Sequence, residues 1–269
     1  MLLTVDHVTT YRYSQPVRGV VQTHRLQPTA FDGQTVLDWQ ITVTDGIKGG
    51  HFRDGAGDHV QAWTIQGPVS EITVTVQGRV QTTDLVGVLR GHRERTPPQC
   101  YLQSTHATDA DMALADLAAS ANAGAGDLAA AHRLSALIAD TIAYTPGATH
   151  AATTAAEALA LGQGVCQDQT HALLAIARRA GIPARYISGY LHATEDGTLH
   201  EAAHAWAELH LPDLGWVGFD PANRCCPDDR YIRLGSGLDA MDAAPIKGIA
   251  RGPGTEQLDV HLAVQQSGQ

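Results

Sequence analysis

Apolar and polar residues alternate along the first ninety residues in the way that antiparallel strands require. The alternation begins near Val5 and returns in later segments that are separated by turn-forming residues. The alternating segments read VDHVTTYRY, ITVTD, QAWTIQG and EITVTVQGRVQTT, and the turn-rich segments include DGIKGG and DGAGD. Several strands separated by turns predict an antiparallel β-sandwich-like domain over residues 1–95.

The pattern changes after this region. The segment RERTPPQ, residues 93–99, is charged and contains two prolines, so it is the expected linker. Ala- and Leu-rich segments with helical spacing follow it, DADMALADLAASANA and DLAAAHRLSALIADTIAY. Helices and further strands after an all-β region predict an α+β fold, with a second domain over residues 100–269.

Composition narrows the functional classes. Asp and Glu number 28 against 18 Lys and Arg, and the formal charge of -10 argues against binding to nucleic acid. No apolar run is long enough to cross a bilayer, so no membrane association is expected. The N-terminus lacks the pattern of an export signal, and four cysteines are too few for a disulfide scaffold. We therefore expect a cytoplasmic protein with reduced thiols.

A cysteine begins the helix with the clearest boundaries. The segment GQGVCQDQTHALLAIARRAGIP predicts a mostly buried helix from Cys166 to Ala180. Asp168 lies in its first turn, and Gly181 and Pro183 end it. Backbone N–H groups at a helix start stabilise a thiolate and can donate to an oxyanion. Cys166 is therefore a candidate nucleophile, although a lone cysteine is more often only a small buried residue.

A predicted hairpin supplies a histidine and a carboxylate. In HEAAHAWAELHLPDLGWVGFDP, a five-residue loop from His210 to Leu214 would pair the apolar residues of the two strands with one another. In that register His204 lies directly opposite Asp220, close enough for the carboxylate to orient the imidazole.

The same residues permit a zinc-binding alternative. HEAAH, residues 200–204, matches the H-E-x-x-H pattern, which on a helix would direct His200 and His204 at a metal with Glu201 as base. No third ligand is evident from the sequence. The matched strand parities favour the hairpin, so we expect no metal and no cofactor.

Four ordered motifs together resemble the transglutaminase-like superfamily, in its bacterial branch with a β-rich N-terminal domain. They are GVCQD, GIPARYISGYL, HAW and GWVGFDP, and RLQP and PVRGV resemble that N-terminal domain. The resemblance implies a papain-like core in which a helix carrying the cysteine packs on an antiparallel sheet carrying histidine and aspartate. It implies a catalytic triad of Cys166, His204 and Asp220. Gln169 and Thr170 depart from the relatives' residues after the cysteine.

The expected function is a thiol-dependent amide hydrolase, a peptidase or amidase acting on a peptide or protein through a thioester. The alternatives are a protein-glutamine transamidase of the same fold, a zinc peptidase and a non-catalytic binding module. Hydrolysis is favoured over cross-linking because no tryptophan lies between Trp63 and Trp206, whereas cross-linking relatives use tryptophans there to wall the thioester.

Overall fold

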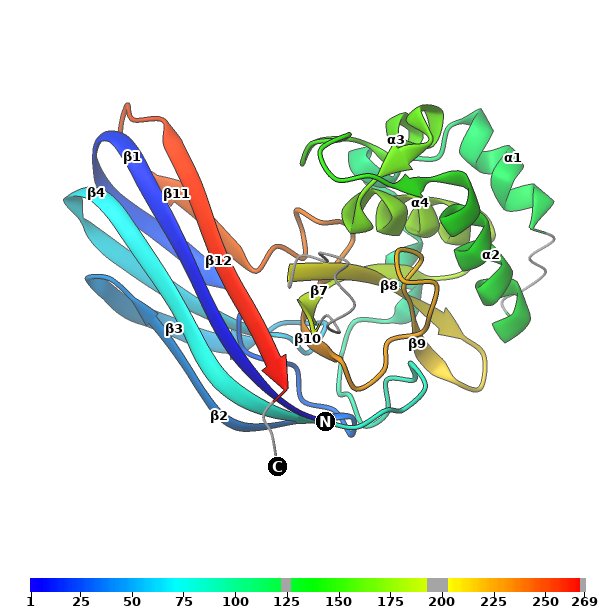
Figure 1. Ribbon diagram of the computed structural model, residues 1–269, viewed down its shortest axis with the longest axis horizontal. Helices are drawn as coiled ribbons and strands as arrows, with labels where there is room; N and C mark the ends of the chain where they lie inside the picture. Colours follow the sequence, from blue (N-terminus) through cyan, green and yellow to red (C-terminus); the bar gives the residue numbers. More distant parts are fainter. Residues whose placement is uncertain (122–126, 193–202, 267–269) are drawn as a thin grey trace.

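The computed structural model describes residues 1–121, 127–192 and 203–266, which form a strand-rich part and a helix-covered part (Figure 1). The strand-rich part is an antiparallel sheet that curls over on itself, and the second part carries all the α-helices of the described chain. The α+β fold class predicted from the sequence is confirmed. None of the described helices is long and apolar enough to cross a membrane.

Two very long strands organise the curled sheet. Its six strands are β1 (Leu2–His24), β2 (Gln34–Val43), β3 (Gly46–Arg53), β4 (His59–Thr82), β11 (Ile246–Ala250) and β12 (Glu256–Gln266). β1 and β4 pair along most of their length, with register shifts between Arg12 and Gly19. On one side of these shifts β1 pairs with β12 and β4 pairs with β2. On the other side β1 pairs with β11 and β4 pairs with β3.

The C-terminal strands lie apart from the core in which the sequence had placed them. β12 pairs with β1 from Leu3↔Gln266 to Tyr13↔Glu256, and β11 pairs with its other end. The N-terminal sheet is thus completed by residues from the far end of the chain, as the red β12 beside the blue β1 in Figure 1 shows. The domain division near residues 95–100 itself stays a prediction.

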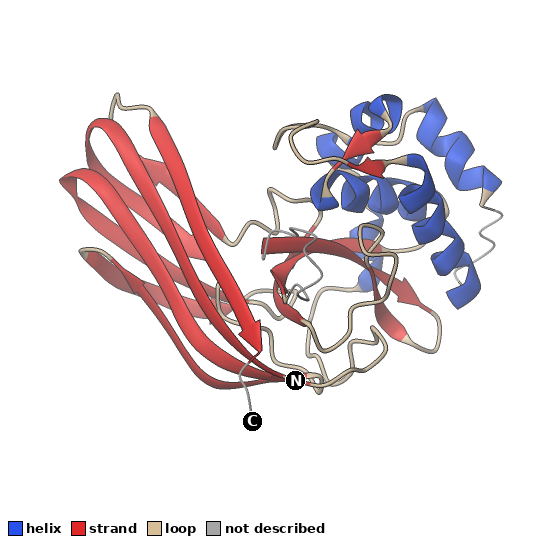
Figure 2. Ribbon diagram, viewed as in Figure 1, coloured by secondary structure: helices blue, strands red, loops and turns tan. Residues whose placement is uncertain are grey.

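The second part is a four-stranded antiparallel sheet with helices on one face (Figure 2). The strands run in the order β10-β7-β8-β9. Their bounds are β7 Ala184–Leu191, β8 Ala203–Leu211, β9 Gly215–Phe219 and β10 Tyr231–Gly237. The helices are α1 (Met112–Ser120), α2 (Leu128–Thr141), α3 (Ala155–Leu161) and α4 (Cys166–Arg179), and the short strands β5 (Ala143–Tyr144) and β6 (Gln163–Gly164) pair beside them.

Helix α4 is the centre of the helical layer. Its residues from Asp168 to Arg178 are buried, and its apolar side chains share one core with Ala205, Ala207 and Leu209 of β8. The helix ends where Gly181 adopts a positive φ of 79°, which allows Ile182 N–H to bond back to the last turn. The helix predicted from Cys166 to Ala180 is therefore confirmed to within one residue.

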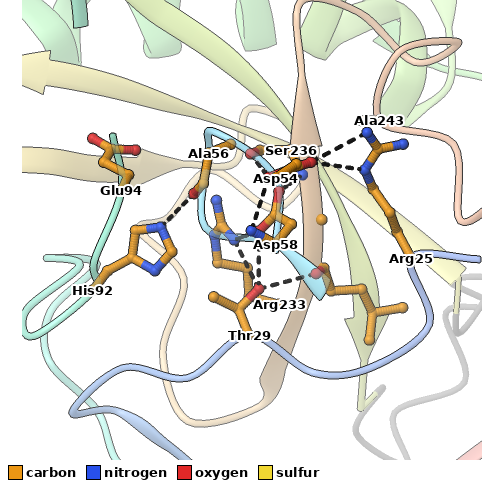
Figure 3. A network of polar contacts seen from close by, with 12 residues as sticks. Arg25, Thr29, Asp54, Ala56, Asp58, His92, Glu94, Arg233, Ser236 and Ala243 are labelled. Carbon is orange, nitrogen blue, oxygen red and sulfur yellow. Dashed lines mark hydrogen bonds and ion pairs between the residues drawn. The ribbon is translucent and has the colours of Figure 1, made fainter. Parts of the chain in front are cut away.

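Buried ion pairs join the two parts of the chain. Glu208 of β8 accepts hydrogen bonds from Arg185 Nε at 2.7 Å and from Arg233 Nε at 2.9 Å. Arg233 also pairs with Asp58 of the loop between β3 and β4 at 2.7 Å, and Asp58 in turn accepts from Ser236 (Figure 3). Arg233 of the core sheet thus shares its charge between Glu208 and a carboxylate of the N-terminal part.

Candidate active site

Cys166 is the first residue of α4 and is half-buried. The turn before it is fixed by Asp168, whose Oδ2 accepts hydrogen bonds from Val165 N–H at 2.7 Å and from the Thr149 hydroxyl at 2.6 Å. Asp168, predicted as a favourable charge in the first turn, thus also satisfies the N–H of the N-cap residue Val165. The cap holds the thiol where the free N–H groups of the first helical turn and the positive end of the helix dipole lie.

The hairpin formed by β8 and β9 supplies His204 and Asp220, but its register differs from the predicted one by two residues. Leu209 pairs with Val217 and Ala207 with Phe219, so the loop is shorter than predicted and spans residues 212–214. Asp213 adopts a positive φ of 65° in this tight turn. A shift of two residues keeps every side chain on its predicted face.

His204 and Asp220 nevertheless meet. Asp220 lies just beyond β9 in an isolated bridge with Cys225, and there its Oδ2 accepts a hydrogen bond from His204 Nε2 at 2.6 Å. Both side chains are almost completely buried. Because Nε2 faces the carboxylate, Nδ1 is the nitrogen left to face the Cys166 thiol.

Two residues around this pair were not found from the sequence. Asp220 Oδ2 also accepts from Asn223 Nδ2 at 2.7 Å and from the Tyr231 hydroxyl at 2.8 Å. Asn223 follows Asp220 by three residues, a local spacing that could have identified it. Tyr231 comes from β10, which does not neighbour β8, so only the folded sheet brings it to the site.

The electrostatics of the pair favour a protonated imidazole. Burial lowers the pKa of His204, but hydrogen bonds to Asp220 and Cys166 outweigh burial and raise it to about 10. Burial acts against ionisation of Asp220, yet its hydrogen bond to His204 and the charge of His204 hold the pKa of that carboxyl below its usual value. The raised pKa of His204 favours an imidazolium at neutral pH, placed between the Asp220 carboxylate and the Cys166 thiol.

Of the two tryptophans of the β8–β9 hairpin, Trp206 and Trp216, only Trp206 lies at the site. The Trp206 ring is stacked on His204 with centroids 6.4 Å apart, and Tyr231 packs against both rings. Trp216 lies elsewhere, over the Arg185 guanidinium, where its indole N–H donates to Glu94. Trp206 and Tyr231 therefore form the aromatic side of the site.

The helical geometry required by the zinc hypothesis is not observed at His204. This residue lies on strand β8, and its Nε2 is occupied by Asp220. His200 and Glu201 lie outside the described residues. Over residues 1–121, 127–192 and 203–266, no three side chains of the metal-binding types gather in one place.

A helix-borne thiol beside a histidine–carboxylate pair on an antiparallel sheet is the arrangement of papain-like thiol enzymes. Two family descriptions match the chain more specifically. The transglutaminase-like superfamily matches residues 115–221, which contain Cys166, His204 and Asp220, and the bacterial transglutaminase-like N-terminal region matches residues 3–81. The chain belongs to the transglutaminase-like superfamily, and the predicted resemblance is confirmed.

Individual relatives extend this result. An uncharacterized protein of Mycobacterium leprae is 31% identical over 97% of this chain and 98% of its own length. A protein-glutamine gamma-glutamyltransferase of Pseudomonas aeruginosa is 32% identical, over 34% of this chain and 14% of that protein. The structure of a candidate cysteine protease from Cytophaga hutchinsonii covers 100% of this chain and 92% of its own with a TM-score of 0.73. At 20% identity this likeness shows the fold alone.

Proposed function

We propose that the protein is a thiol-dependent amide hydrolase that cleaves a peptide or protein substrate through a thioester. The observation that carries the proposal is the buried hydrogen bond between His204 and Asp220 beside the thiol at the start of α4. Such a group of residues can ionise a thiol, move a proton and stabilise an oxyanion without a metal.

The reaction follows from the position of each group. The Cys166 thiolate attacks the amide carbonyl, and the oxygen that becomes negative is stabilised by N–H groups at the start of α4. The His204 imidazolium gives its proton to the leaving amine, which departs and leaves a thioester. The neutral imidazole then removes a proton from a water molecule that attacks the thioester, releasing the acid and restoring the thiolate and the imidazolium.

Transamidation is the second candidate, and the Pseudomonas aeruginosa relative favours it. In that reaction an amine resolves the thioester in place of water. An amine competes with water only if the approach to the thioester is walled, and the sequence has no tryptophan between Trp63 and Trp206. We therefore infer that water is the main acceptor.

A peptide library tests both the thiol and the acceptor. We expect wild-type protein and the Cys100→Ala control, which changes an exposed thiol, to release free acids, whereas Cys166→Ala should release none. Products are read by mass spectrometry with and without a millimolar lysine analogue. Cleavage by Cys166→Ala would refute the thiol mechanism, and a dominant amine adduct would replace hydrolysis with transamidation.

Alkylation distinguishes Cys166 from the vicinal cysteines before any substrate is known. Burial raises the pKa of Cys226 to about 11 and also raises that of Cys225, so at pH 7 only about 10⁻⁴ of the Cys226 thiol is ionised. We expect iodoacetamide to modify Cys166 well before either residue, as measured by peptide mapping over time. Slower labelling of Cys166 than of Cys226 would contradict the assignment of Cys166 as the nucleophile.

A further inference from the structure

A cleft opens into the curled sheet, and all of its lining residues belong to the N-terminal part of the chain. Its volume is about 170 Å³, and β1 to β4 all contribute side chains to its walls. A water molecule occupies about 30 Å³ in the liquid, so the cleft has room for about five waters or for one small organic group. It lies outside the group formed by Cys166, His204 and Asp220.

One end of the cleft is positively charged. Lys48 of β3 places its ammonium 5.5 Å from the centre of the Trp63 ring, and it forms no ion pair with any described carboxylate. No Asp or Glu lines the cleft, although the chain has ten more acidic than basic residues. Lys48 and Lys247 are the only lysines of the sequence, and the exposed Lys48 has no ion-pair partner among the described residues.

Two stacked imidazoles lie beside this lysine. The rings of His51 and His59 are 5.5 Å apart with an interplanar angle of 18°, and His51 Nε2 lies 3.3 Å from His59 Nδ1. One of these nitrogens donates to the other, so the pair has one ring nitrogen left on each residue for a ligand. In the neutral pair only one of these two nitrogens carries a hydrogen, so the pair offers one N–H donor beside the Lys48 ammonium at this end of the cleft.

The remaining wall is aromatic and apolar. Trp39, Ile41 and Trp63 line it, and Trp63 is buried. Two buried polar atoms on lining residues, Trp63 Nε1 and His24 Nδ1, have no hydrogen-bond partner within the described chain. Buried polar groups are normally satisfied, and orphaned ones at a cleft are a sign of a ligand or of bound water.

We propose that this cleft binds an apolar or aromatic carboxylate, such as the last residue of a peptide. The carboxylate pairs with Lys48 and accepts from the one free N–H of the His51–His59 pair, while the apolar group packs against Trp39 and Trp63. The cleft volume of about 170 Å³ suits one aromatic residue. This site is independent of the proposed amide hydrolysis, because none of its residues belongs to the thiol site.

N-acetyl-L-phenylalanine and its neutral amide form a matched pair of probes. The two have nearly the same shape, and only the acid carries a charge. We expect the acid to shift the indole N–H signals of Trp39 and Trp63 in ¹H–¹⁵N spectra of the full chain, and to leave those of Trp206 and Trp216 unchanged. Absence of binding at 20 mM acid, or shifts confined to Trp206, would overturn the proposal.

Lys48→Gln tests the ion pair directly. The substitution should weaken binding of the acid by about two- to fivefold, the effect of an exposed ion pair, and should leave binding of the amide unchanged. Lys247→Gln is the control, since Lys247 pairs with Asp242 outside the cleft. Equal affinity for acid and amide, or equal effects of the two lysine variants, would refute a carboxylate site.

A third probe distinguishes a peptide C-terminus from a free aryl acid, since both carry a carboxylate beside an aromatic ring. Phenylacetate carries the ring and the carboxylate but lacks the amide of a peptide end. Binding at least fivefold tighter for N-acetyl-L-phenylalanine than for phenylacetate would assign the cleft to peptide C-termini. Equal binding would assign it to aryl acids, and failure of both to bind would remove the site altogether.

Discussion

Replacing Asp220 with asparagine is expected to lower kcat by up to about 10⁴-fold, as the same substitution does in a serine protease triad. Asp220 Oδ2 accepts from His204, Asn223 and Tyr231 at once, so a neutral amide in its place cannot satisfy three donors equally well. The imidazole would lose both its fixed orientation and the negative charge that keeps it protonated. Turnover of a substrate from the library measures the effect.

Asp140→Asn is a matched control for this substitution. Asp140 forms its ion pair with Arg224 at 2.6 Å, but both side chains are more than half exposed. We expect less than a twofold change in kcat, because such surface pairs contribute little. Near-normal turnover in Asp220→Asn, with an unchanged melting temperature in both variants, would exclude Asp220 from catalysis.

The Asp220→Asn variant should also change the pH dependence. His204 has its pKa raised to about 10, so its ionic interactions stabilise the fold fully below its ordinary pKa of 6.5, and that stability is lost as pH rises from about 6.5 to 10. Without the carboxylate this alkaline loss should shift to lower pH. Unfolding midpoints between pH 6 and 10 measure the shift, and identical profiles for both proteins would contradict it.

Glu208→Gln is expected to reduce the free energy of unfolding by about 3–5 kcal/mol, because it leaves two buried arginines with one charge partner fewer. Glu208 lies between Arg185 and Arg233, and all three side chains are less than 5% exposed. Urea unfolding of the purified variant gives the measurement. The exposed pair of Arg12 and Glu71 provides the control, since Glu71→Gln should change stability by less than about 1 kcal/mol.

The lowered pKa of Glu208 predicts that the fold loses stability in acid. Burial tends to raise the pKa of Glu208, but the charges of Arg233 and Arg185 outweigh it and lower the pKa from 4.5 to about 2. A depressed pKa means stability that is present above about pH 4.5 and lost as pH falls towards 2. The Glu208→Gln protein should lack this part of the acid transition, and an unchanged transition would show that Glu208 is not its source.

Local signals explain why the thiol helix could be predicted and the hairpin register could not. Helix α4 is specified by Asp168 at its start and Gly181 after its end, both within one turn of the ends. Alternation in β8 specifies only parity, so the sequence predicted the face of His204 and its pairing with Asp220, but placed the register of β8 and β9 two residues away from the observed one. The left-handed conformation of Asp213, which shortens the loop, has no strong signal in an aspartate.

Long-range pairing explains the remaining differences. The return of β11 and β12 to β1 depends on contacts between residues more than 200 positions apart. An alternating pattern predicts a strand but does not specify which other strand it pairs with. Tyr231 and Glu208 lie within strands that read as ordinary core segments. Their roles beside Asp220 and between two arginines follow only from the folded sheet.

The pairing of β1 with β12 also sets an order of events during synthesis. β1 is made before β12, so its outer edge from Leu3 to Tyr13 lacks this partner until residues 256–266 have emerged. Throughout translation the N-terminal part therefore presents an open strand edge to other chains, whereas residues 112–237 can assemble their helices and sheet from contacts nearer in sequence. Ribosome-bound chains that stop before residue 256 are the species in which this edge stays exposed longest.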